Sequence, residues 1–130
     1  MTSTTRIAPP EWIQQIMHEI DTLIFKDGFA HMTDQTDMFF GTGYIQGVEG
    51  IKAFFVKIDE PLEITHEVLE CWEAGNVYFL RGQATMAKKT DPERVVQAPF
   101  MHIYYLADDP NVRIETIRIC AGPLQVDAVM

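Results

Sequence analysis

The stretch THEVLECWEAGNVYFLRGQAT, residues 65–85, decides the fold of this 130-residue chain. It contains two runs rich in apolar, aromatic and β-branched residues, with Ala-Gly-Asn at 74–76 between them. Two such runs around a short turn of this composition are typical of an antiparallel β-hairpin. Pro61 ends the helix predicted before it. The sequence therefore predicts strands over residues 62–72 and 77–87.

Two further strands are predicted downstream of this hairpin. Residues 88–94 are polar and contain an Asp-Pro pair, which indicates a loop. Apolar runs follow over residues 95–106 and 113–120, on either side of a turn at 108–111. The second half of the chain is therefore predicted to be a meander of four long antiparallel strands.

A helix is predicted upstream, where Pro9 and Pro10 precede Glu11. Proline followed by an acidic residue is typical of a first helical turn, and apolar residues then recur at helical spacing from Trp12 to Ile24. This spacing leaves on the other face of the helix Gln14, Gln15, His18, Glu19 and Asp21. The other expected elements are a short second helix over 26–32, a turn over 33–37, strands over 38–40 and 44–46, and a third helix over 48–58.

The order of these elements predicts an α+β fold. Helices that come before a meander cover one face of its sheet, and 130 residues suit one domain, so residues 1–130 are expected to form a single domain with three N-terminal helices. The ends, residues 1–8 and 125–130, are expected to be flexible.

Composition excludes several classes of function. The net charge of -9 disfavours nucleic acid and anionic membrane surfaces as partners, and no apolar run is long enough to span a bilayer. The N-terminus has no hydrophobic signal region, and Cys71 and Cys120 form no CxxC pair. We therefore expect a reduced, cytoplasmic protein whose two thiols are buried and structural.

Known cofactor motifs do not occur in the sequence. It has no Walker loop, dinucleotide fingerprint or GxSxG elbow, and its four histidines lack the spacing of a metal site. No cofactor and no metal are predicted.

Four segments, taken in order, resemble one superfamily. They are TDMFFGTGYIQGVEGIKAFF at 36–55, the hairpin at 65–85, VVQAPFMHIYYL at 95–106 and RIETIRIC at 113–120. Together they are similar to the nuclear transport factor 2-like superfamily, with its cystatin-like fold, and within it to the SnoaL-like polyketide cyclases and ketosteroid isomerases. The resemblance implies a cone-shaped, curved antiparallel or mixed sheet, with a ligand cavity between the first helix and the concave sheet face.

The catalytic groups of two enzymes in this superfamily are missing from the matching positions. The Tyr, the Asp base and the protonated Asp of ketosteroid isomerases are matched here by Ile16 or Met17, Phe40 and Met101. The Arg and two Asp of limonene epoxide hydrolase are matched by Gly82, Ala84 and Ile119. Because these side chains neither transfer protons nor stabilise an enolate, neither mechanism is expected.

His66 is the leading catalytic candidate. Alternation along the strand places it on the same face as Leu62, Ile64 and Val68, which is the face expected to point inward. An inward His could serve as a general base, or it could form a hydrogen bond within the core. Both interpretations remain open at this stage.

Four other polar side chains are candidates. Tyr78 and Tyr105 would donate a hydrogen bond to a substrate oxygen, although aromatic residues on strands are often simply core. Asp37 lies near the position of the family's base, or is instead a solvated acid. His102 follows Met101 and should point outward, unless a β-bulge reverses its direction.

A set of apolar residues is predicted to line the cavity. Many are methionines, which adapt to irregular apolar shapes, so the same residues could alternatively fill a closed core. The set consists of Ile13, Met17, Met38, Phe40, Phe54, Leu80, Met86, Met101, Ile117 and Ile119.

These observations favour a protein that binds a small hydrophobic, natural-product-type molecule and catalyses its cyclisation, isomerisation or dehydration. The alternatives are a carrier or sensor without turnover, and a dimerisation module whose cone is filled. Arg81 and Arg118 are expected on the convex face, through which a homodimer is predicted to form.

Overall fold

The hairpin at 65–85 lies within a long twisted sheet in the computed structural model, which describes residues 3–122. Its strands are β4, Leu62–Ala74, and β5, Val77–Lys88. They pair antiparallel, with Thr65 opposite Thr85 and Ala74 opposite Val77. The turn between them contains Gly75 at φ 61°, a left-handed conformation that glycine adopts without steric cost.

Five more strands complete the sheet in the described part of the chain. They are β1 (Thr5–Ile7), β2 (Asp37–Phe40), β3 (Gly43–Gln46), β6 (Asp91–Leu106) and β7 (Ile114–Ala121). The order across the sheet is β1-β4-β5-β6-β7-β2-β3. All neighbours pair antiparallel except β2 and β7, which are parallel, so the sheet is mixed as the resemblance implied.

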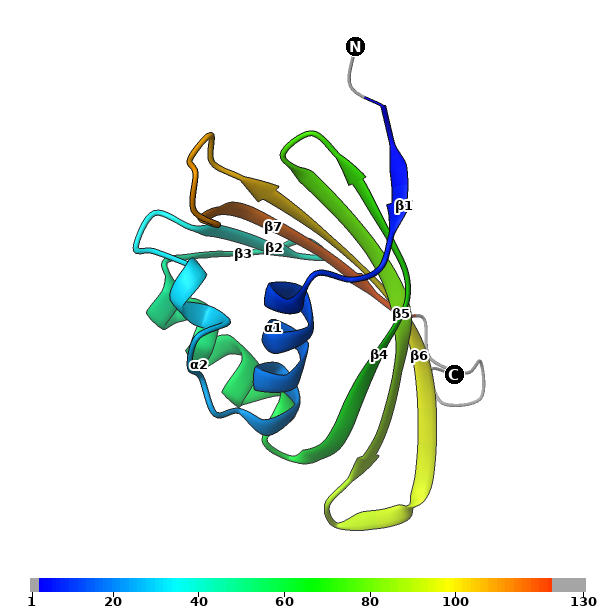
Figure 1. Cartoon of the computed structure of the whole chain (residues 1–130). Helices are drawn as coiled ribbons and strands as arrows, with labels where there is room; N and C mark the ends of the chain where they lie inside the picture. The colour runs from blue at the N-terminus through cyan, green and yellow to red at the C-terminus, as the bar shows by residue number, and fades with distance from the viewer. Residues whose placement is uncertain (1–2, 123–130) are drawn as a thin grey trace.

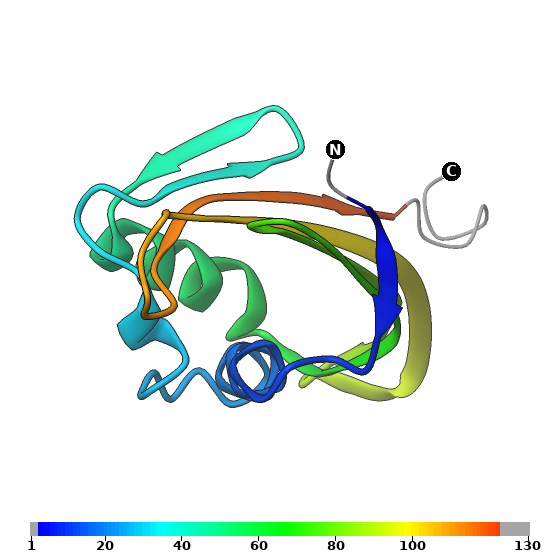
Figure 2. The same cartoon turned by 45° about the horizontal axis from the view of Figure 1, so that its top comes forward.

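Two α-helices cover the concave face of this sheet: α1, Glu11–Thr22, and α2, Val48–Asp59 (Figure 1). Figure 2 shows the long strands bending around α1, with α2 beside it. The apolar stripe of α1 packs inward through Ile13, Ile16 and Ile20, all of which are buried. The result is the predicted α+β cone.

Glu19 fixes the chain just after α1. Its side chain is fully buried and accepts hydrogen bonds from the backbone amides of Lys26, Gly28 and Phe29 at 2.7 to 2.9 Å, and from Gln15 Nε2 at 2.7 Å. Burial alone would raise the pKa of Glu19, but these hydrogen bonds outweigh it and hold the pKa below its usual value. Helical spacing had placed Glu19 on the solvent face of the helix. This prediction is wrong, since the side chain is buried.

Four expectations about the elements and thiols are wrong. The second helix is only a 3₁₀ turn at Phe29–His31, because the backbone amides of Gly28 and Phe29 donate to the Glu19 carboxylate and not to backbone carbonyls. The N-terminal residues that were expected to be flexible include β1, which pairs with the end of β4. The polar loop at 88–94 is mostly strand, since Lys88 already pairs with Asp91. Cys120 is exposed on β7, whereas Cys71 is buried as expected.

The expected flexible end at 125–130 lies outside the described residues. No helix among residues 3–122 combines the length and the apolarity required to cross a membrane.

Candidate active site

An inner pocket of about 200 Å³ lies between the concave sheet face and the C-terminal end of α2. Its walls are mostly apolar, and the ionisable side chains among its described lining residues are Asp59, His66 and His102. The apolar lining residues are Phe40, Phe55, Ile58, Leu62, Ile64, Ala84, Met86, Ala98, Pro99, Phe100, Ile119 and Ala121.

His66 is held by Asp21, near the C-terminus of α1. Asp21 Oδ1 lies 2.6 Å from the His66 ring atom Nδ1, and Asp21 Oδ2 accepts a hydrogen bond of 3.1 Å from the His66 backbone amide. Both side chains are mostly buried. One carboxylate thus fixes both the position and the orientation of the imidazole ring.

This contact also determines the tautomer of neutral His66. A carboxylate only accepts hydrogen bonds, so Nδ1 carries the proton and Nε2 keeps a free lone pair. Nε2 has no hydrogen-bond partner among the described residues, and the ring packs edge-on against Phe100, with centroids 5.1 Å apart. His66 can therefore accept a proton from a molecule in the inner pocket.

His102 also packs against the Phe100 ring, with centroids 5.0 Å apart. Its Nδ1 is 3.1 Å from the buried hydroxyl of Tyr104. The Tyr104 hydroxyl has no other recorded acceptor among the described residues, so it donates to Nδ1, and the ring proton is on Nε2. Burial, with a smaller contribution from His66, lowers the pKa of His102 to about 3 and keeps this ring neutral.

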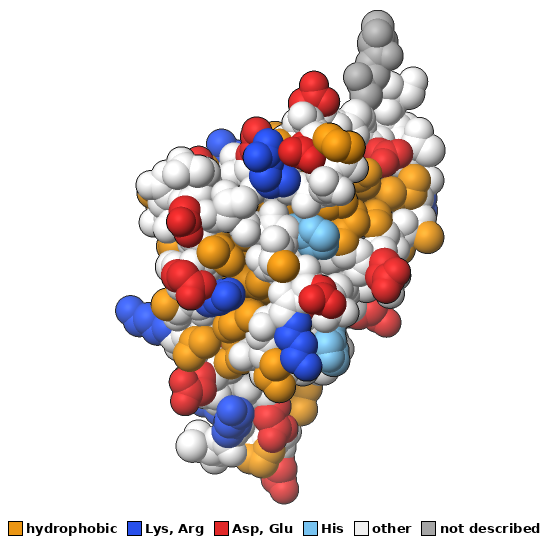
Figure 3. Space-filling view, turned by 60° about the vertical axis from the view of Figure 1, so that its left-hand side comes forward, with side chains coloured by type: hydrophobic (Ala, Val, Ile, Leu, Met, Phe, Trp, Pro, Cys, Tyr) orange, Lys and Arg blue, Asp and Glu red, His pale blue; other side chains and the backbone are white. Residues whose placement is uncertain are grey.

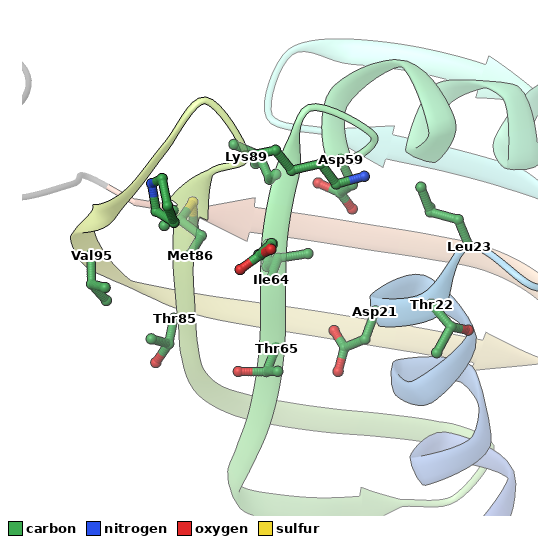
Figure 4. Close-up of a pocket in the computed structure, with 14 residues that line it drawn as sticks. Asp21, Thr22, Leu23, Asp59, Ile64, Thr65, Thr85, Met86, Lys89 and Val95 are labelled. Carbon is green, nitrogen blue, oxygen red and sulfur yellow. The ribbon is translucent and has the colours of Figure 1, made fainter.

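An outer pocket of about 490 Å³ adjoins the inner one. The two pockets share four lining residues, Asp59, Leu62, Ile64 and Met86. Figure 4 shows the carboxylates of Asp21 and Asp59 extending from the ends of the two helices toward β4. Burial raises the pKa of Asp59 to about 6; Asp21 adds to the shift and His66 opposes it.

The predicted direction is right for one of the two pocket histidines and wrong for the other. His66 points inward as expected. His102 was predicted to point outward and is instead buried in the inner pocket, because Ala98, Phe100, His102 and Tyr104 form the inward face of β6.

Three other catalytic candidates do not line the inner pocket. Tyr78 donates its hydroxyl to Glu73 at 2.6 Å, and this bond, together with burial, raises the pKa of Tyr78 to about 12. Tyr105 alternates with inward-facing Tyr104 and so faces the convex side. Asp37 accepts a hydrogen bond of 2.5 Å from the exposed Tyr44 hydroxyl, away from the inner pocket.

The predicted apolar lining divides into three groups. Phe40, Met86 and Ile119 do line the inner pocket. Met101 is 47% exposed on the convex face, so its predicted inward direction is wrong. The other residues belong to the packed core or its edge and do not line the inner pocket: Ile13, Met17, Met38, Phe54, Leu80 and Ile117.

Two functional candidates were missed, Asp21 and Asp59. Helical spacing had placed Asp21 on the solvent face. The third helix was predicted to end at residue 58, so Asp59 was not assigned to either face of it. Asp59 follows the buried residues Ile51 and Phe55 at intervals of four, so the helical pattern continued by one residue would have placed it inward.

The described residues contain no cluster of three or more His, Cys, Asp or Glu side chains arranged to hold a metal ion. On the face that Figure 3 presents, acidic and basic side chains are interspersed among apolar ones.

The sequence matches no protein-family model and no curated protein. Three solved structures are similar in fold. One is described as a SnoaL-like polyketide cyclase from Jannaschia sp. CCS1, with a TM-score of 0.72 and 19% identity over 92% of this chain and 87% of that one. Another is a protein with a ketosteroid isomerase-like fold from Catenulispora acidiphila, in complex with trimethylamine, with a TM-score of 0.70 and 10% identity over 86% and 85%.

The third is an LEH-like epoxide hydrolase from M. tuberculosis, with a TM-score of 0.67 and 12% identity over 85% of this chain and 80% of that one. At these identities the likeness concerns the fold. The chain has the cone-shaped fold of the nuclear transport factor 2-like proteins, as its sequence indicated.

Proposed function

We propose that this protein binds a small hydrophobic molecule containing a carbonyl group and catalyses its cyclisation, isomerisation or dehydration by proton transfer. The observation that carries this proposal is the Asp21–His66 pair in the wall of an apolar pocket. An imidazole with one nitrogen fixed by a carboxylate and the other free is a suitable general base near neutral pH.

In this mechanism His66 Nε2 removes a proton from the carbon next to the carbonyl. Asp21 stabilises the imidazolium that forms, and it does so strongly because the pair is mostly shielded from water. The substrate then carries a developing negative charge on its carbonyl oxygen.

His102 stabilises that charge. Its Nε2–H is a neutral donor in the pocket wall, and a neutral imidazole can polarise a carbonyl without giving up its proton. One histidine thus removes a proton while the other donates a hydrogen bond, and both imidazole rings pack against Phe100.

The fold neighbours support a reaction on a hydrophobic substrate, since one is described as a polyketide cyclase and another as an epoxide hydrolase. Gly82, Ala84 and Ile119, which the sequence resemblance places at the catalytic positions of limonene epoxide hydrolase, carry no group able to transfer a proton.

The test uses 4-phenylbutan-2-one in D₂O, with NMR detection of exchange at the carbons next to the carbonyl. We expect the wild type to accelerate exchange and His66→Gln to lower the enzymatic rate by about 100-fold or more. Asp21→Asn should reduce the rate less, because Nε2 remains. His18→Gln is the matched control, since His18 is exposed on α1 and does not line the inner pocket.

An unchanged exchange rate in a folded His66→Gln variant would overturn the role of His66. The second candidate function is a carrier, which the mostly apolar lining of the inner pocket favours. Saturable binding of 4-phenylbutan-2-one to the wild type without any acceleration of exchange would support the carrier over the enzyme.

A further inference from the structure

Asp59 is a buried carboxyl group without a recorded partner. It is only 6% exposed, and neither of its oxygens has a hydrogen bond among the described residues. Every fully buried polar side-chain atom in residues 3–122 does have a partner, so the oxygens of Asp59 must reach a pocket surface. Asp59 lines both pockets and therefore lies at the boundary between them.

The charged groups around Asp59 come from several elements. Asp21 on α1 and His66 on β4 interact with it electrostatically, and the outer pocket adds Glu63 from β4 and Lys89 from the turn before β6. Burial and Asp21 favour the protonated form, while His66 opposes it. The carboxyl group thus holds or releases a proton near pH 6.

We infer that Asp59 is the proton donor to a leaving hydroxyl group, so that the substrate class is a hydrophobic β-hydroxy carbonyl compound and the reaction is the elimination of water. This inference rests on the proposed role of His66 as the base. It adds a second catalytic residue and selects one of the three proposed reaction types.

The chemistry of the leaving group supports this choice. Hydroxide is a poor leaving group and departs readily only when it receives a proton. Isomerisation needs one base that removes and returns a proton, whereas elimination of water needs an acid as well. The inner pocket contains such an acid together with a base and a hydrogen-bond donor.

Atoms and charges balance in this step. His66 Nε2 takes the proton from the carbon next to the carbonyl, and that C–H electron pair becomes the C=C bond. The C–O bond to the hydroxyl breaks as Asp59 protonates the departing oxygen, and water leaves through the outer pocket that Asp59 also lines. The proton on His66 then returns to Asp59, which restores both residues.

Two probes that yield the same product test the role of Asp59. The first is 4-hydroxy-4-phenylbutan-2-one, which loses water, and the second is its 4-acetoxy analogue, which loses acetate and needs no proton donor. Both give 4-phenylbut-3-en-2-one, which is measured by its ultraviolet absorbance. Wild type, Asp59→Asn, His66→Gln and the control Glu60→Gln are compared; Glu60 is the exposed acid next to Asp59.

We expect Asp59→Asn to lower the loss of water by about 100-fold or more. The same variant should lower the loss of acetate, and hydrogen exchange next to the carbonyl, at least tenfold less than it lowers the loss of water, because neither of these reactions needs a proton donor. The wild-type rate of water loss should also fall as the pH rises through about 6, because Asp59 loses its proton, and Asp59→Asn should lack this fall. Glu60→Gln should behave as the wild type.

Three results would overturn the inference while leaving the proposed function standing. The first is equal water loss in Asp59→Asn and wild type. The second is no water loss by a wild type that accelerates exchange. The third is the loss of exchange and of both eliminations in a folded Asp59→Asn variant, which would mean that Asp59 shapes the pocket instead of donating a proton. A wild type that does not accelerate exchange would contradict the proposed function itself.

Discussion

Asp59 should lower the stability of the folded protein at neutral and higher pH. Its folded-state pKa of about 6 is above the ordinary value of 3.8, so the folded state binds the proton more tightly than the unfolded state. Stability should therefore fall as the pH rises from about 4 to 6 and then stay level. We predict that Asp59→Asn raises the free energy of unfolding at pH 8 by about 3 kcal/mol and leaves it nearly unchanged at pH 3.5.

Urea denaturation of the wild type and Asp59→Asn at both pH values measures this effect. Glu60→Gln removes an equal charge from the neighbouring exposed position and should change stability little at either pH. A gain from Asp59→Asn that is equally large at pH 3.5 would show that burial of the ionised carboxylate is not its cause.

Glu19 is expected to be the most costly charged side chain to remove. Glu19→Ala would leave the buried amides of Gly28 and Phe29 unpaired, and we predict a loss of about 3 kcal/mol or more in the free energy of unfolding. Because the pKa of Glu19 is lowered in the folded state, its contribution is present above the ordinary value of 4.5 and is lost as the pH falls through the folded-state pKa.

Chemical denaturation at pH 7 tests this prediction, with Glu11→Ala as the control because Glu11 is exposed on the same helix. Glu19→Gln keeps one acceptor oxygen and should lose less stability than Glu19→Ala. Equal stability of Glu19→Ala and wild type would contradict the anchoring role that we assign to Glu19.

The sequence placed His66 correctly but missed its partner Asp21. Alternation with Leu62, Ile64 and Val68 settles the direction of His66 on β4, whereas Asp21 lies at the edge of the apolar stripe of α1, where a helical pattern does not separate inside from outside. On β6 both faces carry apolar residues, such as Phe100 inside and Met101 outside. Alternation there gives no signal, and this is why His102 was assigned to the wrong face.

At the scale of the elements, Gly82 permits the close approach of β4 and β5. A Cβ atom at this position would lie 2.0 Å from the carbonyl oxygen of Glu67 and 2.5 Å from Cζ of Phe100. The pairing of the two strands shifts register just beyond this point, between Val68 and Glu70. Only glycine fits without displacing backbone atoms.

We predict that Gly82→Ala lowers the free energy of unfolding by about 3 kcal/mol or more, since the clash involves a backbone oxygen that cannot turn away. Thermal and urea denaturation measure the loss. Gly43→Ala is the comparison, because a Cβ there approaches nothing closer than 3.3 Å. Equal stability of Gly82→Ala and wild type would mean that the strands separate at little cost.

The elements that sequence analysis identified best are those with strong patterns of their own. The four long strands are apolar runs bounded by turn residues, α2 has regular apolar spacing, and the positions of all five agree with the structure to within a few residues. The segments it misassigned depend on distant partners: β1 forms only by pairing with β4, and the turn at Phe29–His31 is held by Glu19. Such contacts leave no periodic signal in the local sequence.

At the scale of the whole molecule, the convex face of the sheet carries a row of apolar side chains along β6. Met101 is 47% exposed, and Ile103 and Tyr105 are half-buried on the same side of β6. Exposed apolar groups that adjoin one another on a sheet typically mark an interface. The helices cover only the concave face, so no other described element covers these side chains.

We propose that two copies of the chain associate through this convex face, as the sequence suggested. Met101→Glu would place a charge within an apolar contact and repel its symmetry mate in a protein that already carries a net charge of -9. We predict that it weakens dimerisation by at least about tenfold, measured by sedimentation velocity over a range of concentrations. Ile24→Glu is the control, because Ile24 is 58% exposed but follows α1, away from the convex sheet face. If the wild type sediments as a monomer at every concentration, or if both variants weaken the dimer equally, the convex face is not the interface.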